Sequence, residues 1–281
     1  MKSHTKTWLS IDEIGGVVPP YLPNFNFSSS HIDTTHQSIG KTPLKDGFLV
    51  EIRNHPLGQF GPDFEQAKSE AADIENRTGN VEVESAGNVI PGWLRREDAL
   101  KLYELAYFSQ GNILELGSFH GLSTSILANA CKNAPTPKQV ETIDLDPGCT
   151  AATKANLEGL GLLDYVTIHT GDATVLVKDC ISAEKKFGFV FIDHSHEYQP
   201  CLDVCQLLAD VTVPGGFCLF HDFNDKRNRD PENSDYGVYQ AVQHGLDKEK
   251  FKFYGIYGCT GLYRRVEDRS GIASWVGGLF S

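Results

Sequence analysis

The sequence predicts an α/β protein, a Rossmann-like three-layer sandwich with a mostly parallel seven-stranded sheet and one antiparallel edge strand. From residue 112 onward, short apolar runs alternate with helix-compatible stretches of about ten to fifteen residues, the pattern of βαβ units. The last two runs are separated only by Gly258 and Cys259. A gap of that size forces antiparallel pairing.

The N-terminal part, residues 1–92, is predicted to be an irregular arm followed by helix. Six of the 13 prolines fall within its first 62 residues, which excludes long regular elements there. Ala-, Glu- and Lys-rich sequence predicts a helix over 63–77. A second helix is predicted over 95–109, at the start of the main domain.

The main domain is predicted to span residues 93–266, followed by a C-terminal tail at 267–281. A helix over Leu122–Lys132 follows the first strand. The predicted strands are Asn112–Gly117, Gln139–Asp144, Tyr165–Thr170, Phe187–Asp193, Gly215–His221, Phe251–Tyr257 and Thr260–Val266.

Charge and composition narrow the class of partner. The net charge is −12, which argues against a broad surface for nucleic acid or anionic lipid. No run of 18 apolar residues and no secretory signal are seen, so a cytoplasmic protein without membrane contact is expected. The 7 cysteines include no CxxC pair and are expected to be core thiols.

Three turns at the carboxyl ends of the first three strands predict a nucleotide-like ligand. Glu115-Leu116-Gly117-Ser118-Phe119-His120-Gly121 links the first strand to a helix, where backbone N–H groups face a ligand. Phe119 replaces the second glycine of the dinucleotide fingerprint. Asp144 ends the second strand and suits ribose hydroxyls, although it could instead cap the next helix. Gly171-Asp172-Ala173 forms the third turn.

Acidic and imidazole side chains follow the fourth and fifth strands. Asp193 and His196 come after one buried strand, and His221 and Asp222 after the next. Carboxylates with an imidazole suit a divalent cation such as Mg²⁺, Mn²⁺ or Fe²⁺. The alternative is a hydrogen-bonded His and Asp pair that only shapes the pocket.

Together these motifs resemble those of class I S-adenosylmethionine-dependent methyltransferases, over about Trp93 to Val266. The Gly-Ser-Phe-x-Gly turn is most similar to the metal-dependent branch that includes catechol and macrocin-type sugar O-methyltransferases. The resemblance implies roles for a group of cofactor-binding residues: Gly117 and Ser118 at the methionine end, Asp144 at the ribose, Asp172 and Ala173 at the adenine, with Glu115 and Asp193 adding negative charge toward the cationic cofactor.

The same resemblance implies a metal held by Asp193, His221 and Asp222, with His196 as general base beside Asp193. His221 stands where the sugar enzymes have Glu, and Phe223 where the catechol enzymes have Asn, so Asn224 is a second candidate ligand. Ser195 replaces the second acid of the sugar-enzyme pattern. A helix-capping role is the alternative for His196.

The expected function is methyl transfer from S-adenosylmethionine to a hydroxyl of a small-molecule acceptor. A divalent metal, magnesium or else Mn²⁺ or Fe²⁺, is expected to assist the reaction at the three ligands just named. Three alternatives stay open: a non-catalytic nucleoside-binding protein, an NAD-dependent oxidoreductase, and other metal chemistry like that of the similar cephalosporin hydroxylases. The acceptor pocket is expected between the arm, Trp93 and the loop after His221. The arm would act as a lid or as a homodimer contact.

Overall fold

The computed structural model describes residues 37–43, 49–54, 81–134, 136–223, 225–229, 233–257 and 259–266. The helix predicted over 63–77 lies outside these residues. Within the N-terminal part, β1 (Gln37–Pro43) and β2 (Leu49–Asn54) pair as an antiparallel ribbon, and β3 (Glu84–Ser85) and β4 (Asn88–Val89) form a second short one.

The main domain contains a seven-stranded sheet in the order β10-β11-β9-β8-β5-β6-β7. Five strands, β9, β8, β5, β6 and β7, run parallel, so the predicted fold class is confirmed. The strands are β5 (Ile113–Leu116), β6 (Val140–Asp144), β7 (Val166–Thr170), β8 (Phe187–Ile192), β9 (Thr212–Phe220), β10 (Phe251–Tyr257) and β11 (Thr260–Arg265).

The reversed strand is β11, which lies one place in from the edge. It pairs antiparallel with β9 on one side and with β10 on the other, so β10 runs in the same direction as the five parallel strands. Burial explains this order. Thr260 to Tyr263 are all buried, as an interior strand requires, whereas Lys252 in β10 is exposed.

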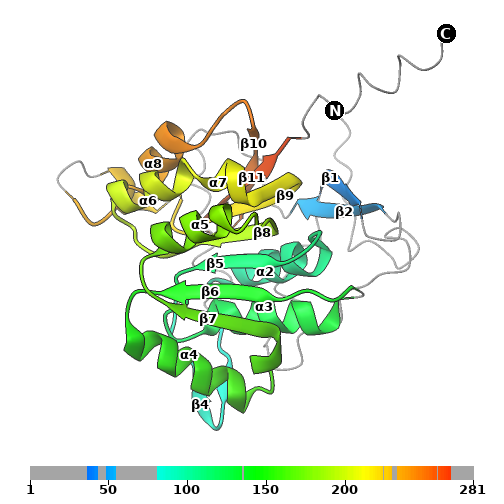
Figure 1. Cartoon of the computed structure of the whole chain (residues 1–281), viewed down its shortest axis with the longest axis vertical. Helices are drawn as coiled ribbons and strands as arrows, with labels where there is room; N and C mark the ends of the chain where they lie inside the picture. Colours follow the sequence, from blue (N-terminus) through cyan, green and yellow to red (C-terminus); the bar gives the residue numbers. More distant parts are fainter. Residues whose placement is uncertain are drawn as a thin grey trace.

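Helices cover both faces of the sheet and complete the three layers (Figure 1). One face packs against α2 (Arg96–Phe108) and α3 (Leu122–Asn133), and α4 (Pro147–Gly159) packs beside α3. The other face packs against α5 (Ala173–Ser182), α6 (Tyr198–Cys205), α7 (Leu208–Val211) and α8 (Val238–Gly245). Alternate strand residues serve the two faces, as Ile113 and Leu114 illustrate.

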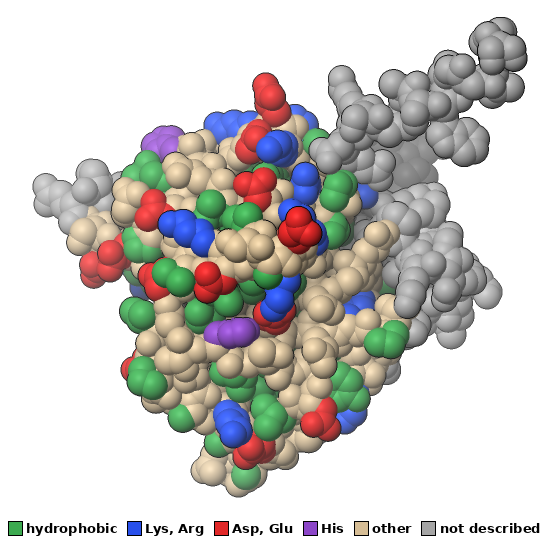
Figure 2. Space-filling view, in the orientation of Figure 1, with side chains coloured by type: hydrophobic (Ala, Val, Ile, Leu, Met, Phe, Trp, Pro, Cys, Tyr) green, Lys and Arg blue, Asp and Glu red, His purple; other side chains and the backbone are tan. Residues whose placement is uncertain are grey.

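The parallel strands end at one edge, which brings distant turns together. The turn after β5, the end of β6, and the segments after β8 and β9 all lie there. None of the described helices is both long and apolar enough to cross a membrane. On the face shown in Figure 2, basic and acidic side chains are intermixed.

At the opposite end of β6, Lys138 closes the C-terminal end of α2. Its buried ammonium donates to the backbone oxygens of Ala106 at 3.1 Å, Tyr107 at 2.9 Å and Ser109 at 2.7 Å. The last carbonyls of a helix have no partner within the helix, and a cation is favoured at that end. Lys138 therefore joins α2 to the sheet.

Replacing Lys138 by Met keeps much of the apolar stem but leaves these buried carbonyls without their donor. We expect Lys138→Met to lower the free energy of unfolding by about 2–3 kcal/mol, measured by urea denaturation. The exposed Lys132 provides the control, and Lys132→Met should leave the midpoint unchanged. Equal midpoints for the two variants would contradict the proposed role of Lys138.

Candidate functional site

A cavity of about 550 Å³ opens at the carboxyl edge of the sheet. Its walls come from residues 91–94 before α2, the turn at 117–119, the ends of β6, β8 and β9, and the segment leading to α8. This volume lies within the range of small-molecule sites. The cavity brings Gly117, Ser118, Asp144, Asp193, His196, His221 and Asp222 together.

Gly117 is required first by packing against the chain that follows β8. Its φ is +98°, and a Cβ placed there would lie 2.1 Å from the backbone oxygen of Asp193. The backbone N–H of Asp193 also donates to the Leu116 oxygen at 2.8 Å. The glycine thus lets the turn and Asp193 approach closely, in addition to lining the cavity.

Asp144 is held at the cavity wall by backbone donors. One carboxylate oxygen accepts from the Phe119 N–H at 2.8 Å, and the other accepts from the Asp146 N–H at 3.0 Å. Asp146, not Asp144, caps α4, through a 2.7 Å hydrogen bond from the Gly148 N–H. Asp144 is therefore free of the capping role that the sequence left open.

Glu115 is placed differently from its predicted role in cofactor binding. Its carboxylate is fully buried and accepts from the hydroxyls of Ser123 at 2.6 Å, Thr124 at 2.6 Å and Thr142 at 2.7 Å. It does not line the cavity, because β5 directs its side chain into the layer beneath α3. Glu115 instead ties β5, β6 and α3 together under the turn.

Asp172 and Ala173 lie beside Asp144 at the same edge but do not line the cavity. The Gly171 N–H donates to the Asp144 backbone oxygen at 2.9 Å, which joins the two turns. Asp172 is the N-cap of α5 and accepts from the Val175 N–H at 3.0 Å. Its structural role is thus a helix cap, and contact with an adenine stays a prediction.

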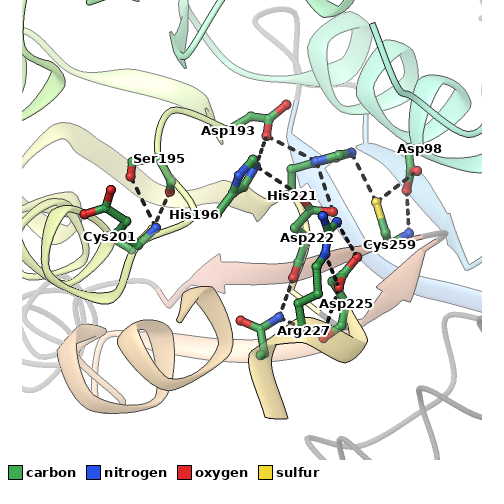
Figure 3. Close-up of polar contacts among 12 residues, drawn as sticks. Asp98, Asp193, Ser195, His196, Cys201, His221, Asp222, Asp225, Arg227 and Cys259 are labelled. Atoms are coloured by element: carbon green, nitrogen blue, oxygen red, sulfur yellow. Dashed lines mark hydrogen bonds and ion pairs between the residues drawn. The ribbon is translucent and has the colours of Figure 1, made fainter. Parts of the chain in front are cut away.

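Two carboxylates and two imidazoles converge where β8 and β9 end (Figure 3). His221 Nδ1 lies 3.1 Å from Asp193 Oδ1, and His196 Nε2 lies 3.0 Å from Asp222 Oδ2. The crossed distances, from His196 Nε2 to Asp193 Oδ1 and from His221 Nδ1 to Asp222 Oδ1, are both 3.7 Å. The predicted convergence of the two strand ends is confirmed, because β8 and β9 are parallel neighbours.

Backbone conformation turns the Asp222 side chain toward this group. Asp222 has a φ of +52°, in the left-handed region, which Asp tolerates better than most non-glycine residues. The Asn228 side chain donates to the Asp222 backbone oxygen at 2.8 Å and holds the turn. Such strained conformations cluster at functional sites.

The charges of the cluster shift one another's pKa. Burial raises the pKa of the Asp222 carboxyl, but His221 and His196 outweigh it and bring the pKa below its usual range. For His196, burial lowers the pKa, whereas Asp193 and Asp222 raise it, with a net pKa of about 9. The pKa of His221 is also well above its usual value, because Asp193 and other neighbouring acids outweigh burial.

The donor atoms fit a divalent cation. His221 Nδ1 is buried and has no hydrogen-bond partner among the described residues, although it lies 3.1 Å from an Asp193 oxygen. Adjacent ligands of a cation with bonds near 2.1 Å at right angles lie about 3 Å apart. Two separations in the cluster, of 3.0 and 3.1 Å, match that spacing, and Asp193, His196 and His221 could together surround one ion. Asn224, the other candidate ligand, lies outside the described residues.

Two residues of the site, Tyr236 and Arg227, were not expected from the sequence. The Tyr236 ring stacks on His196, with centroids 4.7 Å apart and planes at 7°. Arg227 lies 3.7 Å above the Tyr236 ring and is paired with Asp225. On the other wall, Trp93 stacks with Phe119 at 6.2 Å. Tyr236 and Arg227 lie in a polar loop whose sequence gives no sign of their stacking.

The chain is similar to known proteins over the strands that carry this site. Residues 114–223 match the family model described as a methyltransferase domain, which covers β5 to the end of β9. This part of the chain is therefore similar to a methyltransferase domain. The resemblance to class I S-adenosylmethionine-dependent methyltransferases, including the catechol O-methyltransferase branch, is thereby confirmed.

One curated relative and two solved structures illustrate the likeness. A catechol O-methyltransferase of Niastella koreensis is 30% identical over 105 residues, 37% of this chain, and the match spans only 45% of that relative. An O-methyltransferase from Bacillus cereus, solved with SAH, has 17% identity and a TM-score of 0.53, covering 74% of this chain and 92% of that one. Cofactor-bound Rv0187 from MTB has 20% identity and a TM-score of 0.52, covering 73% and 90%. These structures establish the fold of the methyltransferase domain.

The buried Glu115 gives a prediction on stability against pH. Burial raises its pKa from 4.5 to about 7, only partly offset by its three hydroxyl donors. Because the folded-state pKa lies above the unfolded one, the stabilisation is complete below about pH 4.5 and is lost as the pH rises to about 7. The loss is about 3 kcal/mol at about 1.4 kcal/mol per pKa unit.

Glu115→Gln should remove this slope, because an amide keeps two hydroxyl donors and does not ionise. The measurement is urea denaturation of wild type and variant between pH 4.5 and 8. Glu158→Gln, on the exposed face of α4, is the control and should follow the wild type. Parallel stability curves for wild type and Glu115→Gln would show that ionised Glu115 is not penalised.

Proposed function

We propose that this protein transfers a methyl group from S-adenosylmethionine to a hydroxyl of a small-molecule acceptor. The observation that carries the proposal is that the Gly117 turn, the Asp144 carboxylate and the Asp193, His196, His221 and Asp222 cluster share one cavity. The methyltransferase domain supports the cofactor, and the catechol O-methyltransferase relative supports oxygen as the acceptor atom.

The protein's own contribution is to hold the reactants in line and to exclude water. When bound, S-adenosylmethionine supplies an electrophilic methyl group on a sulfonium. Gly117 and Ser118 offer backbone at the methionine end, and Asp144 presents carboxylate lone pairs to ribose hydroxyls. Asp193, which follows β8 and lines the cavity, adds negative charge that favours a cationic cofactor. Such positioning can supply a large part of the barrier reduction.

We propose that a divalent cation would be held by Asp193, His221 and Asp222, and that His196, whose donor atom also lies within reach of such an ion, would stay unbound to it. When bound, it would draw an acceptor hydroxyl toward its deprotonated form. Magnesium prefers oxygen ligands alone, whereas a nitrogen ligand such as His221 Nδ1 suits Mn²⁺ or Fe²⁺ better. We therefore propose a metal-assisted reaction in which Mn²⁺ or Fe²⁺ competes with Mg²⁺ for the site.

His196 is the proposed general base. Its Nε2 faces both Asp193 and Asp222, and its ring is held by stacking on Tyr236. A divalent cation held between Asp193 and Asp222 would oppose protonation of the His196 imidazole. Nε2 of His196 would then be free to accept the hydroxyl proton. Tyr236 keeps the ring in the orientation that this transfer requires.

Calorimetric titration with S-adenosylhomocysteine tests the cofactor site. We expect Asp144→Asn to weaken binding at least about tenfold, since the ribose loses a charged acceptor. Asp146→Asn is the matched control, because this neighbouring acid caps α4 outside the cavity, and its affinity should stay near that of wild type. Failure of the wild type to bind would refute the assignment of the cofactor.

Transfer of labelled methyl groups to a library of hydroxylated compounds tests the reaction. His196→Asn should lower kcat by about 10²–10⁴-fold, with unchanged affinity for S-adenosylhomocysteine. His244→Asn, on α8 away from the cavity, is the control. Full turnover after EDTA treatment would remove the metal from the mechanism, and binding without any transfer would favour a non-catalytic binding protein.

A further inference from the structure

Two buried residues lie directly behind His221, on the side away from the cavity. Cys259 Sγ is 3.1 Å from His221 Nε2, and Asp98 Oδ2 is 3.4 Å from the same sulfur (Figure 3). All three side chains are buried. Asp98 comes from α2, His221 from the end of β9, and Cys259 from the hairpin between β10 and β11.

Asp98, Cys259 and His221 form a hydrogen-bonded row. The direction of each hydrogen bond in this row follows from the donors around Asp98. Its carboxylate accepts from the Cys259 N–H at 2.9 Å and from the Arg95 N–H at 3.2 Å, so it acts as an acceptor throughout. The Cys259 thiol has one hydrogen, and it points to Asp98. The sulfur is then left with lone pairs only, which can accept the Nε2–H of His221.

The opposite ring nitrogen is thereby assigned to the cavity. When a cation binds, the His221 imidazole gives up one proton and keeps one hydrogen, and a hydrogen retained on Nε2 leaves the Nδ1 lone pair available as a ligand. Nδ1 is the atom that faces Asp193 Oδ1 at 3.1 Å and Asp222 Oδ1 at 3.7 Å, and it makes no hydrogen bond within the part of the chain that the structure describes. The edge of the Phe191 ring, 6.2 Å away at 80°, packs against the imidazole and limits its rotation.

We propose that Asp98 and Cys259 are positioning residues that orient His221 and direct its Nδ1 lone pair to a divalent cation. The inference rests on the proposed function, because it takes the cation site at Asp193, His221 and Asp222 as given. Residues that orient a metal-binding histidine typically change affinity by about 10–100-fold when removed. The row thus links α2 and the last hairpin to the ligand set of the site.

Mn²⁺ binding to the purified full chain, measured by calorimetry, tests this proposal without requiring an acceptor. Cys259→Ala removes the sulfur and should weaken Mn²⁺ binding about 10–100-fold. Cys259→Ser restores a side chain that donates and accepts, and should recover most of the affinity. Cys205→Ala, a buried cysteine of α6 on the other face of the sheet, should bind Mn²⁺ like the wild type.

Asp98→Asn provides an independent variant, because its amide N–H can donate to the Cys259 sulfur and so reverse the hydrogen bond between residues 98 and 259. It should weaken Mn²⁺ binding by at least about tenfold. Substitution of Co²⁺ gives a second readout, since a reoriented His221 changes the visible absorption of the bound ion. S-adenosylhomocysteine affinity and thermal melting show that each variant has kept its fold.

The outcomes separate the positioning role from the metal site itself. If the wild type binds Mn²⁺ and both Cys259→Ala and Asp98→Asn bind it equally well with the same Co²⁺ spectrum, the positioning role is refuted while the metal site stands. If the wild type binds neither ion, both the metal site and the positioning role are refuted. Loss of Mn²⁺ affinity in Cys205→Ala would mean that general loosening of the core, not the row, controls the site.

Discussion

The close approach between the turn after β5 and the backbone after β8 is the constraint on which the site depends. A side chain at residue 117 would overlap the Asp193 carbonyl, so only glycine lets the two strand ends meet. Glu115 secures the turn from below, through hydroxyls of α3 and β6. Because the turn is held there, Asp144 and the cluster that contains Asp193 line the same cavity.

Charge complementarity is the second organising feature. A buried carboxylate, Asp222, and a half-buried one, Asp193, would repel each other in one cluster, and each is instead faced by an imidazole. Pairing offsets the cost of burying these charges, and among the described residues no hydrogen bond to His221 Nδ1 is found, although Asp193 Oδ1 lies 3.1 Å away. A cation bound in this site would take the place of the imidazole protons as the positive partner of the two carboxylates.

Much of the fold was predictable from the sequence because the βαβ signal is local. Apolar runs and turn residues placed all seven strands of the sheet, and the two-residue hairpin revealed the reversed strand. The position of β11 between β9 and β10 was not predictable, because the order depends on which strand of the hairpin is buried on both faces. Asp193, His196, His221 and Asp222 were found because parallel strands deliver their last residues to one edge.

Where the structure differs from or adds to the residues expected from the sequence, the causes are physical. Glu115 looked like a cofactor ligand because its motif neighbours the ligand turn, but strand alternation directs it inward. Asp98 and Cys259 escaped notice because they are 161 residues apart and carry no pattern of their own. Tyr236 and Arg227 lie in the segment between β9 and α8, and their stacking depends on the path of that segment, which local sequence patterns do not specify.

The interior position of β11 bears on how the molecule is made. The chain emerges from synthesis with β5 to β9 first, and those parallel strands can pair before the last hairpin exists. Until β10 and β11 have left the ribosome, β9 has an open edge and His221 has no sulfur behind it. Completion of the sheet and placement of Cys259 behind His221 are therefore the same late event.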